Sequence, residues 1–127
     1  MYLYNAIKTP DGTILESHHR HDYVFHRDAN GRSYAVDGGH DYLKRTCQIM
    51  DYEELSLTIE DEHSKLREVF GWFSYGKTGK EKRHKILLKN MDTDHILAVL
   101  DTQKQIQGTD VETLFRNELK FRGDYYE

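Results

Sequence analysis

The sequence contains one cysteine in 127 residues and no long apolar run. A single cysteine, Cys47, excludes a disulfide framework, and without a second thiol or a patterned histidine partner it does not indicate a zinc site. We expect Cys47 to be a small buried or half-buried hydrophobic side chain. No stretch approaches the roughly 20 apolar residues that span a bilayer, and the first residues lack the basic start and apolar run of a signal peptide. The sequence therefore predicts a cytoplasmic protein that does not bind membranes.

Internal repeats, low-complexity segments and linkers are also absent from the sequence. A chain of this length matches the usual size of one compact domain, so we predict a single domain over residues 1–127.

A strong net positive charge is found in one segment of this acidic chain. The formal charge is −4, but Lys77 to Lys85 carries +4 in nine residues, which leaves −8 on the other 118. Binding to duplex nucleic acid depends on many simultaneous phosphate contacts, so a generally acidic chain is a poor candidate for it. A local basic segment suits a small anion better, and nucleic acid is therefore an unlikely partner.

Residues 71–78, GWFSYGKT, fit the pattern G-x-x-x-x-G-K-[ST] of a nucleotide-binding P-loop. Their surroundings argue against that function. The preceding segment has helical periodicity, the following GKEKRHK has no apolar stripe, and Trp72, Phe73 and Tyr75 are bulky where the backbone should close around phosphate. The chain is also too short for the five-stranded domain that a P-loop requires. We predict a β-hairpin instead, with strands over 72–76 and 83–89 and a turn at 77–80.

The first third of the chain has the turn signals of a β-meander. Asp11-Gly12 and Asn30-Gly31 separate alternating segments, which predicts three or four antiparallel strands up to Gly39. We expect a short helix over 40–50, with Tyr42, Leu43 and Cys47 inward, and a further strand over 54–59. Residues 60–70 have helical spacing.

Two amphipathic helices are predicted at the end of the chain, over 91–106 and 108–123. Asp92 or Thr93 should cap the first helix and Asp110 the second, and Gly123 fits the position just after the second. The expected fold class is α+β, with an N-terminal antiparallel β-meander, a second hairpin and two C-terminal amphipathic helices.

Histidines gather in the stretch SHHRHDYVFH, residues 17–26. On a strand His19 and His21 would share a face and could form a metal pair, but a site needs a third ligand that the spacing does not supply. Two alternatives to a metal site remain. The histidines are structural or face solvent, or Arg20 or His21 binds an anion. No spacing indicates paired carboxylates or a Ser/His/Asp arrangement, so we predict no catalytic residues, no metal, no cofactor and no enzymatic activity.

Four blocks carry a resemblance to a known family: RHDYVFHRDANGRSYAVDGGHDYL at 20–43, WFSYGKTGK at 72–80, ILLKNMDTDHILAVLDTQ at 86–103 and LFRNELKFR at 114–122. They resemble a family of small bacteriophage proteins similar to the first described Thoeris anti-defence proteins. The resemblance implies a sponge that sequesters cyclic ADP-ribose-type signals in the host cytoplasm without cleaving them, and that can also hold cyclic oligonucleotides. It also implies dimers that assemble further, with ligand pockets between subunits.

The sequence departs from this family pattern at two places. Phe73 stands where we expect glycine, and the very basic KEKRHK at 80–85 replaces a milder loop with proline.

A cyclic nucleotide offers π-faced bases and several phosphates, so its binder needs aromatic side chains for stacking and Arg or Lys donors for oxyanions. The predicted ligand-binding residues are Arg20, His21, Trp72, Phe73, Tyr75, Lys77, Arg83, Lys85, Asn90, Arg116 and Arg122. In the alternative interpretation Trp72 and Tyr75 are core residues and the lysines form a solvated hairpin tip.

Oligomerisation is predicted from the two C-terminal helices. Their apolar set, which includes Leu97, Leu100, Phe115 and Leu119, exceeds what one thin sheet face covers, so we expect at least a dimer. Its boundary should bring the aromatic-basic hairpin near Arg116 or Arg122 of another chain. A second possible function is an accessory protein that binds a host protein or single-stranded nucleic acid through the basic hairpin.

Overall fold

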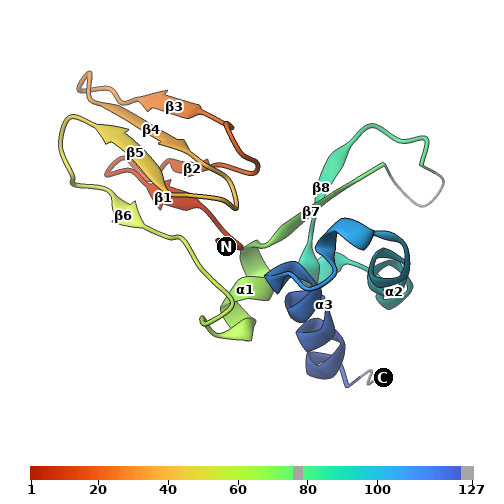
Figure 1. The fold of residues 1–127 in the computed structure, drawn as a ribbon. Helices are drawn as coiled ribbons and strands as arrows, with labels where there is room; N and C mark the ends of the chain where they lie inside the picture. Colours follow the sequence, from red (N-terminus) through yellow and green to blue (C-terminus); the bar gives the residue numbers. More distant parts are fainter. Residues whose placement is uncertain (76–78, 124–127) are drawn as a thin grey trace. The chain divides into compact units, whose positions relative to one another are not determined.

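The computed structural model describes residues 1–75 and 79–123 and divides the chain into two compact units, Met1–Glu60 and Asp61–Glu127 (Figure 1). The described residues form three α-helices and eight strands in three small antiparallel sheets, which confirms the α+β class. The prediction of a single domain stays a prediction. Each unit is described by itself.

The first unit contains two three-stranded antiparallel sheets. One has the order β2-β1-β6 and the other β3-β4-β5. The strands are β1 (Ala6–Lys8), β2 (Ile14–Glu16), β3 (Val24–Arg27), β4 (Ser33–Asp37), β5 (Lys44–Cys47) and β6 (Glu53–Glu54). Gly12 and Gly31 have φ of 88° and 79°, as the two hairpin turns require. The predicted meander is therefore confirmed, although its strands divide between two sheets.

Alternate side chains of these strands form the core of the first unit. Ile7 and Leu15 from one sheet cluster with Tyr34 and Val36 from β4, and Cys47 packs half-buried against them. Because strand side chains alternate between faces, one face of each sheet can be apolar while the other stays polar. The prediction of a half-buried Cys47 is confirmed.

The predicted helix over 40–50 is wrong. Residues Lys44–Cys47 form strand β5, which pairs with β4 in the register Tyr34↔Cys47 to Asp37↔Lys44. Lys44 and Thr46 are exposed while Arg45 and Cys47 are half-buried, the alternation of a strand. The predicted strand over 54–59 is reduced to β6 and an isolated bridge between Tyr4 and Leu57.

The second unit combines three helices with one hairpin. Its elements are α1 (His63–Val69), β7 (Gly71–Ser74), β8 (His84–Leu87), the 3-10 helix η1 (Leu88–Asn90), α2 (Thr93–Thr102), the 3-10 helix η2 (Lys104–Ile106) and α3 (Asp110–Phe121). Gly71 follows helix α1 and opens a strand, so the P-loop-like sequence begins in a hairpin, as predicted. Its last residues, Gly76, Lys77 and Thr78, lie outside the described residues. No helix in the described part of the chain is long and apolar enough to cross a membrane.

Helix α3 supplies the centre of the core in the second unit. Phe115 is fully buried and meets the rings of Phe70 and Trp72 edge-on, with centroids 5.9 and 5.5 Å away. Both predicted C-terminal helices are present, and Gly123 has the expected positive φ of 79° after the end of α3. The N-cap of α3 is Thr109, one residue before the predicted Asp110.

The structure does not support the surplus of apolar surface from which oligomerisation was predicted. Phe115 and Leu119 are buried inside the unit, and Leu97 and Leu100 are half-buried, so the C-terminal helices do not present the expected surplus of apolar surface.

Candidate functional site

Hairpin β7-β8 places an aromatic ring and two cations on one face. Strand register sets Trp72 opposite Ile86 and Phe73 opposite Lys85, and directly opposed residues share a face. Trp72 lies on the face that packs against Phe115. Phe73 therefore lies on the other face, where the Arg83 guanidinium carbon is 4.3 Å from the centre of its ring. We call Gly71, Phe73, Arg83 and Lys85 the hairpin face.

Gly71 shapes this face by having no side chain. A Cβ there would lie 2.4 Å from both Cγ and Cδ of Lys85, so the lysine stem crosses β7 over the glycine. Any larger residue at position 71 would push the lysine away from its place beside Phe73.

Arg83 and Phe73 form a cation-π pair, which contributes about 0.5–1 kcal/mol at an exposed site. A guanidinium on an aromatic ring presents a flat plane on which a nucleobase can stack, and its edge carries donors for phosphate oxygens. Lys85 adds a second cation on the same face. The hairpin face can therefore contact both a base and an oxyanion.

The other predicted residues of the second unit lie in different surroundings. Trp72 is half-buried and packs against the core residue Phe115, while Tyr75 is 54% exposed and therefore not the core residue that the alternative interpretation expected. Asn90 is exposed at the end of η1. Arg116 is exposed on α3, 3.9 Å from the Glu112 carboxylate one turn away. Lys77 lies outside the described residues.

Arg122 belongs to a cluster of charged side chains around the buried Glu118 carboxylate. Its Nε donates to Glu118 at 2.7 Å, and its Nη1 and Nη2 donate to the Thr93 hydroxyl and the Leu88 carbonyl at 3.2 and 3.0 Å. A ligand phosphate would have to displace these bonds. Arg122 is thus a structural residue here, which the prediction of a ligand contact did not foresee.

Glu118 is the centre of that cluster and is completely buried. Besides Arg122 it accepts bonds from His63 Nε2 at 2.8 Å and from Arg67 Nε and Nη2 at 2.9 and 3.0 Å. Burial alone would raise the pKa of Glu118, but the bonds from Arg67, His63 and Arg122 outweigh burial and lower the pKa below its ordinary value. The cluster ties α1 to the end of α3.

Arg20 and His21 lie in a turn of the first unit. His21 has φ of 67°, uncommon for a residue with a side chain, and its Nδ1 is 3.3 Å from the Tyr42 hydroxyl. Arg20 Nε is 3.8 Å from the exposed Asp41 carboxylate. In the described residues no three His, Cys, Asp or Glu side chains converge as metal ligands. Arg20 and His21 belong to the first unit and the hairpin face belongs to the second.

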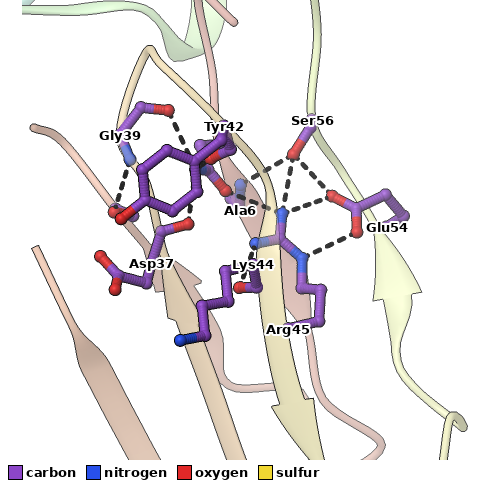
Figure 2. A network of polar contacts seen from close by, with 10 residues as sticks. Ala6, Asp37, Gly39, Tyr42, Lys44, Arg45, Glu54 and Ser56 are labelled. Carbon is purple, nitrogen blue, oxygen red and sulfur yellow. Dashed lines mark hydrogen bonds and ion pairs between the residues drawn. The ribbon is translucent and has the colours of Figure 1, made fainter. Parts of the chain in front are cut away.

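A second polar network lies in the first unit, around Arg45 (Figure 2). Arg45 makes a two-pronged contact with Glu54, through Nε at 2.9 Å and Nη2 at 2.7 Å, and also donates to Ser56 and to the side-chain oxygen of buried Asn5. The Asn5 amide in turn donates to three backbone carbonyls, those of Asp37 at the end of β4 and of Gly39 and Tyr42 in the loop that follows.

The network joins β5 to β6 and to Asn5, the residue before β1. Burial would raise the pKa of Glu54, but hydrogen bonds from Arg45 and Ser56 outweigh burial and lower it. We interpret the network as structural.

Sequence reasoning missed the Glu118 cluster, although two spacings signal it. His63 and Arg67 are one helical turn apart on α1, and Glu118 and Arg122 are one turn apart on α3.

Comparison of the chain with protein-family models, curated proteins and solved structures found no match.

Proposed function

We propose that this protein is a phage anti-defence sponge. It binds cyclic ADP-ribose-type immune signals, and cyclic oligonucleotides as further ligands, in the cytoplasm of the host cell and does not cleave them. The observation that carries the proposal is the Arg83 guanidinium stacked 4.3 Å from the Phe73 ring, with Lys85 on the same face. This pairing of an aromatic plane with two cations matches a ligand made of bases and phosphates.

The energy available from one hairpin face is limited. Stacking contributes roughly 1–3 kcal/mol per base and a charge-assisted hydrogen bond about 1.5–3 kcal/mol. One ring and two cations thus supply about 4–9 kcal/mol, which corresponds to millimolar to sub-micromolar binding before ordering costs. A sponge must hold a scarce signal more tightly than that, so we propose that a second chain completes the pocket.

The assembly that we propose is a homo-oligomer, at least a dimer, with ligand pockets between subunits. Arg116 is the candidate donor from the neighbouring chain, because it is exposed and its contact with Glu112 at 3.9 Å is a weak surface ion pair. Arg122 is a poorer candidate because Glu118 holds it.

Ligand-dependent stabilisation tests this proposal. A cyclic ADP-ribose isomer at 100 times its dissociation constant should stabilise the wild type by about 2.7 kcal/mol. Phe73→Leu and Arg83→Gln should each weaken binding at least about tenfold, which corresponds to the loss of 1.4 kcal/mol. Lys104→Gln, an exposed lysine on η2, is the matched control and should bind normally.

The alternative function is binding of single-stranded nucleic acid or a host protein through the basic hairpin. It is favoured by the exposed cations Lys80, Lys82 and Arg83 at the hairpin tip. Binding of generic single-stranded DNA that falls steeply with salt, together with no stabilisation by any cyclic nucleotide, would select this alternative.

A further inference from the structure

Strand β3 is an open edge that carries exposed aromatic side chains. It is the terminal strand of the sheet β3-β4-β5. Phe25 within the strand is 53% exposed and Tyr23 immediately before it is 56% exposed. Tyr23, Phe25 and Arg27 alternate in sequence and therefore lie on one face of the sheet.

The backbone of β3 is also open, and its hydrogen-bond pattern identifies the residues that face outward. Asp28 N–H donates to the Arg32 carbonyl at 2.9 Å, and the antiparallel ladder continues through His26↔Tyr34 to Val24↔Val36. In such a ladder every second residue bonds to the neighbouring strand. Asp28, His26 and Val24 thus bond toward β4, and the N–H and C=O groups of Phe25 and Arg27 point to the open edge.

The other edge strands of the first unit are short or charged. β6 consists of two glutamates, β2 has three residues and ends in Glu16, and β5 carries Lys44 and uses Arg45 to bind Glu54. Charged and short strands resist pairing with other chains. β3 has no lysine, proline or acid within it.

We propose that β3 pairs antiparallel with β3 of a second copy of this chain, about a two-fold axis at Phe25. In this register Phe25 exchanges both backbone bonds with Phe25 of the second copy, and the Arg27 N–H reaches the Tyr23 carbonyl. The two three-stranded sheets then form one continuous six-stranded sheet.

A second copy fits this edge because the segment is complementary to itself. The two Phe25 rings become neighbours on the exposed face, and each Tyr23 ring lies opposite an Arg27 guanidinium, a favourable cation-π pair. A foreign strand would need the same spacing of aromatic and cation to match it. This two-fold, self-complementary arrangement is the usual form of homodimer contacts.

The length of the extended segment selects the register. Residues 23–27 pair fully with themselves only when Phe25 lies on the axis. A shift in one direction sets Arg27 opposite His21, which has a positive φ and is not extended. A shift in the other direction sets Tyr23 opposite Ala29, in the turn after β3, and places two His26 side chains together.

This inference rests on the proposed assembly and names one of its interfaces, but its test does not require any ligand. Directly opposite residues of a hydrogen-bonded pair have Cα atoms about 5.5 Å apart, inside the range of about 4.4–6.8 Å for disulfides. Cysteine variants in a Cys47→Ser background therefore report which residues lie opposite each other.

Phe25→Cys should crosslink to itself on mild oxidation, and a mixture of Tyr23→Cys and Arg27→Cys should form mixed dimers. Ile14→Cys is the matched control, because Ile14 is 52% exposed on edge strand β2. Docked cysteines have effective concentrations near millimolar, so at about 10 μM protein Phe25→Cys should crosslink about a hundredfold faster than the control.

Light scattering supplies a second measurement that does not use cysteine. Phe25→Lys should lower the mass of the wild-type assembly, and Ile14→Lys should leave the mass unchanged. The inference is overturned if Phe25→Cys crosslinks no faster than Ile14→Cys, or if Phe25→Lys retains the wild-type mass. Loss of ligand binding with crosslinking intact would refute the proposed function alone.

Discussion

Replacement of Glu118 by glutamine should destabilise the protein strongly. Glu118 Oε1 accepts from His63 and from Arg67 Nε, and Oε2 accepts from Arg67 Nη2 and from Arg122. A glutamine amide has one acceptor oxygen and one donor group. In either orientation its NH₂ would meet an arginine donor, and the half-buried arginines would lose the charge that balances them.

The size of the effect follows from burial. Glu118 is 0% exposed, and removal of one partner from a buried ion pair costs about 3–5 kcal/mol. Domains are stable by only about 5–15 kcal/mol, so this is a large fraction of the total. For a chain of this length it corresponds to a fall in melting temperature of about 10–20 °C.

Urea and thermal unfolding, followed by circular dichroism, measure this change. Glu112→Gln is the matched control on the same helix, because Glu112 makes a long 3.9 Å contact with the exposed Arg116. It should cost at most about 0.5 kcal/mol. A Glu118→Gln variant that unfolds within about 1 kcal/mol of the Glu112→Gln control would refute the description of the cluster as a structural hub.

Three further predictions follow from the two units. Asn5→Ala should lower the free energy of unfolding in urea by about 2–3 kcal/mol, because it removes the side-chain donor of three backbone carbonyls and one acceptor of the Arg45 guanidinium; a loss below about 0.5 kcal/mol would contradict this. Gly38→Ala should lower the melting temperature more than Gly31→Ala. Both glycines have positive φ, but of the two only Gly38 would place a Cβ against a backbone atom, 1.8 Å from the Tyr42 carbonyl oxygen. Equal melting temperatures would show that no clash exists. The pKa values of Glu118 and Glu54 are lower in the folded state than their ordinary value of 4.5, so both stabilise the fold at higher pH, and the unfolding free energy should fall as the pH drops below about 4.5. That acid dependence should be weaker in Glu118→Gln, and an unchanged dependence would contradict the sign of the shift.

Local signals in the sequence predicted much of the fold. Asn30-Gly31 marks a tight turn because Gly31 accepts positive φ, and Gly123 ends α3 for the same reason. The aromatic residues at 72, 73 and 75 favoured a strand over a phosphate loop, and β7 confirms this. These features depend on a few neighbouring residues, which the sequence displays directly.

Strand β5 was predicted as a helix because Tyr42, Leu43 and Cys47 fit a helical period. Pairing with β4 and the contact of Arg45 with Glu54 decided the outcome, and both partners lie outside the segment 40–50 whose periodicity was considered. Tertiary contacts of this kind override local periodicity.

The candidate site was predicted in part. The bulky aromatic residues and the basic segment indicated the hairpin. Because side chains alternate along a strand, however, Trp72 and Phe73 lie on opposite faces of the hairpin. Arg122 and Arg116 looked equivalent in sequence, and only the buried position of Glu118 distinguishes them.

Recovery of the ligand after binding tests the central claim most directly. The protein is saturated with a cyclic ADP-ribose isomer, separated from unbound ligand, heat-denatured, and the supernatant is chromatographed. The proposed sponge returns the ligand intact and in stoichiometric amount, with Arg83→Gln returning much less. A cleaved product, or no ligand retained by the wild type, would contradict the account.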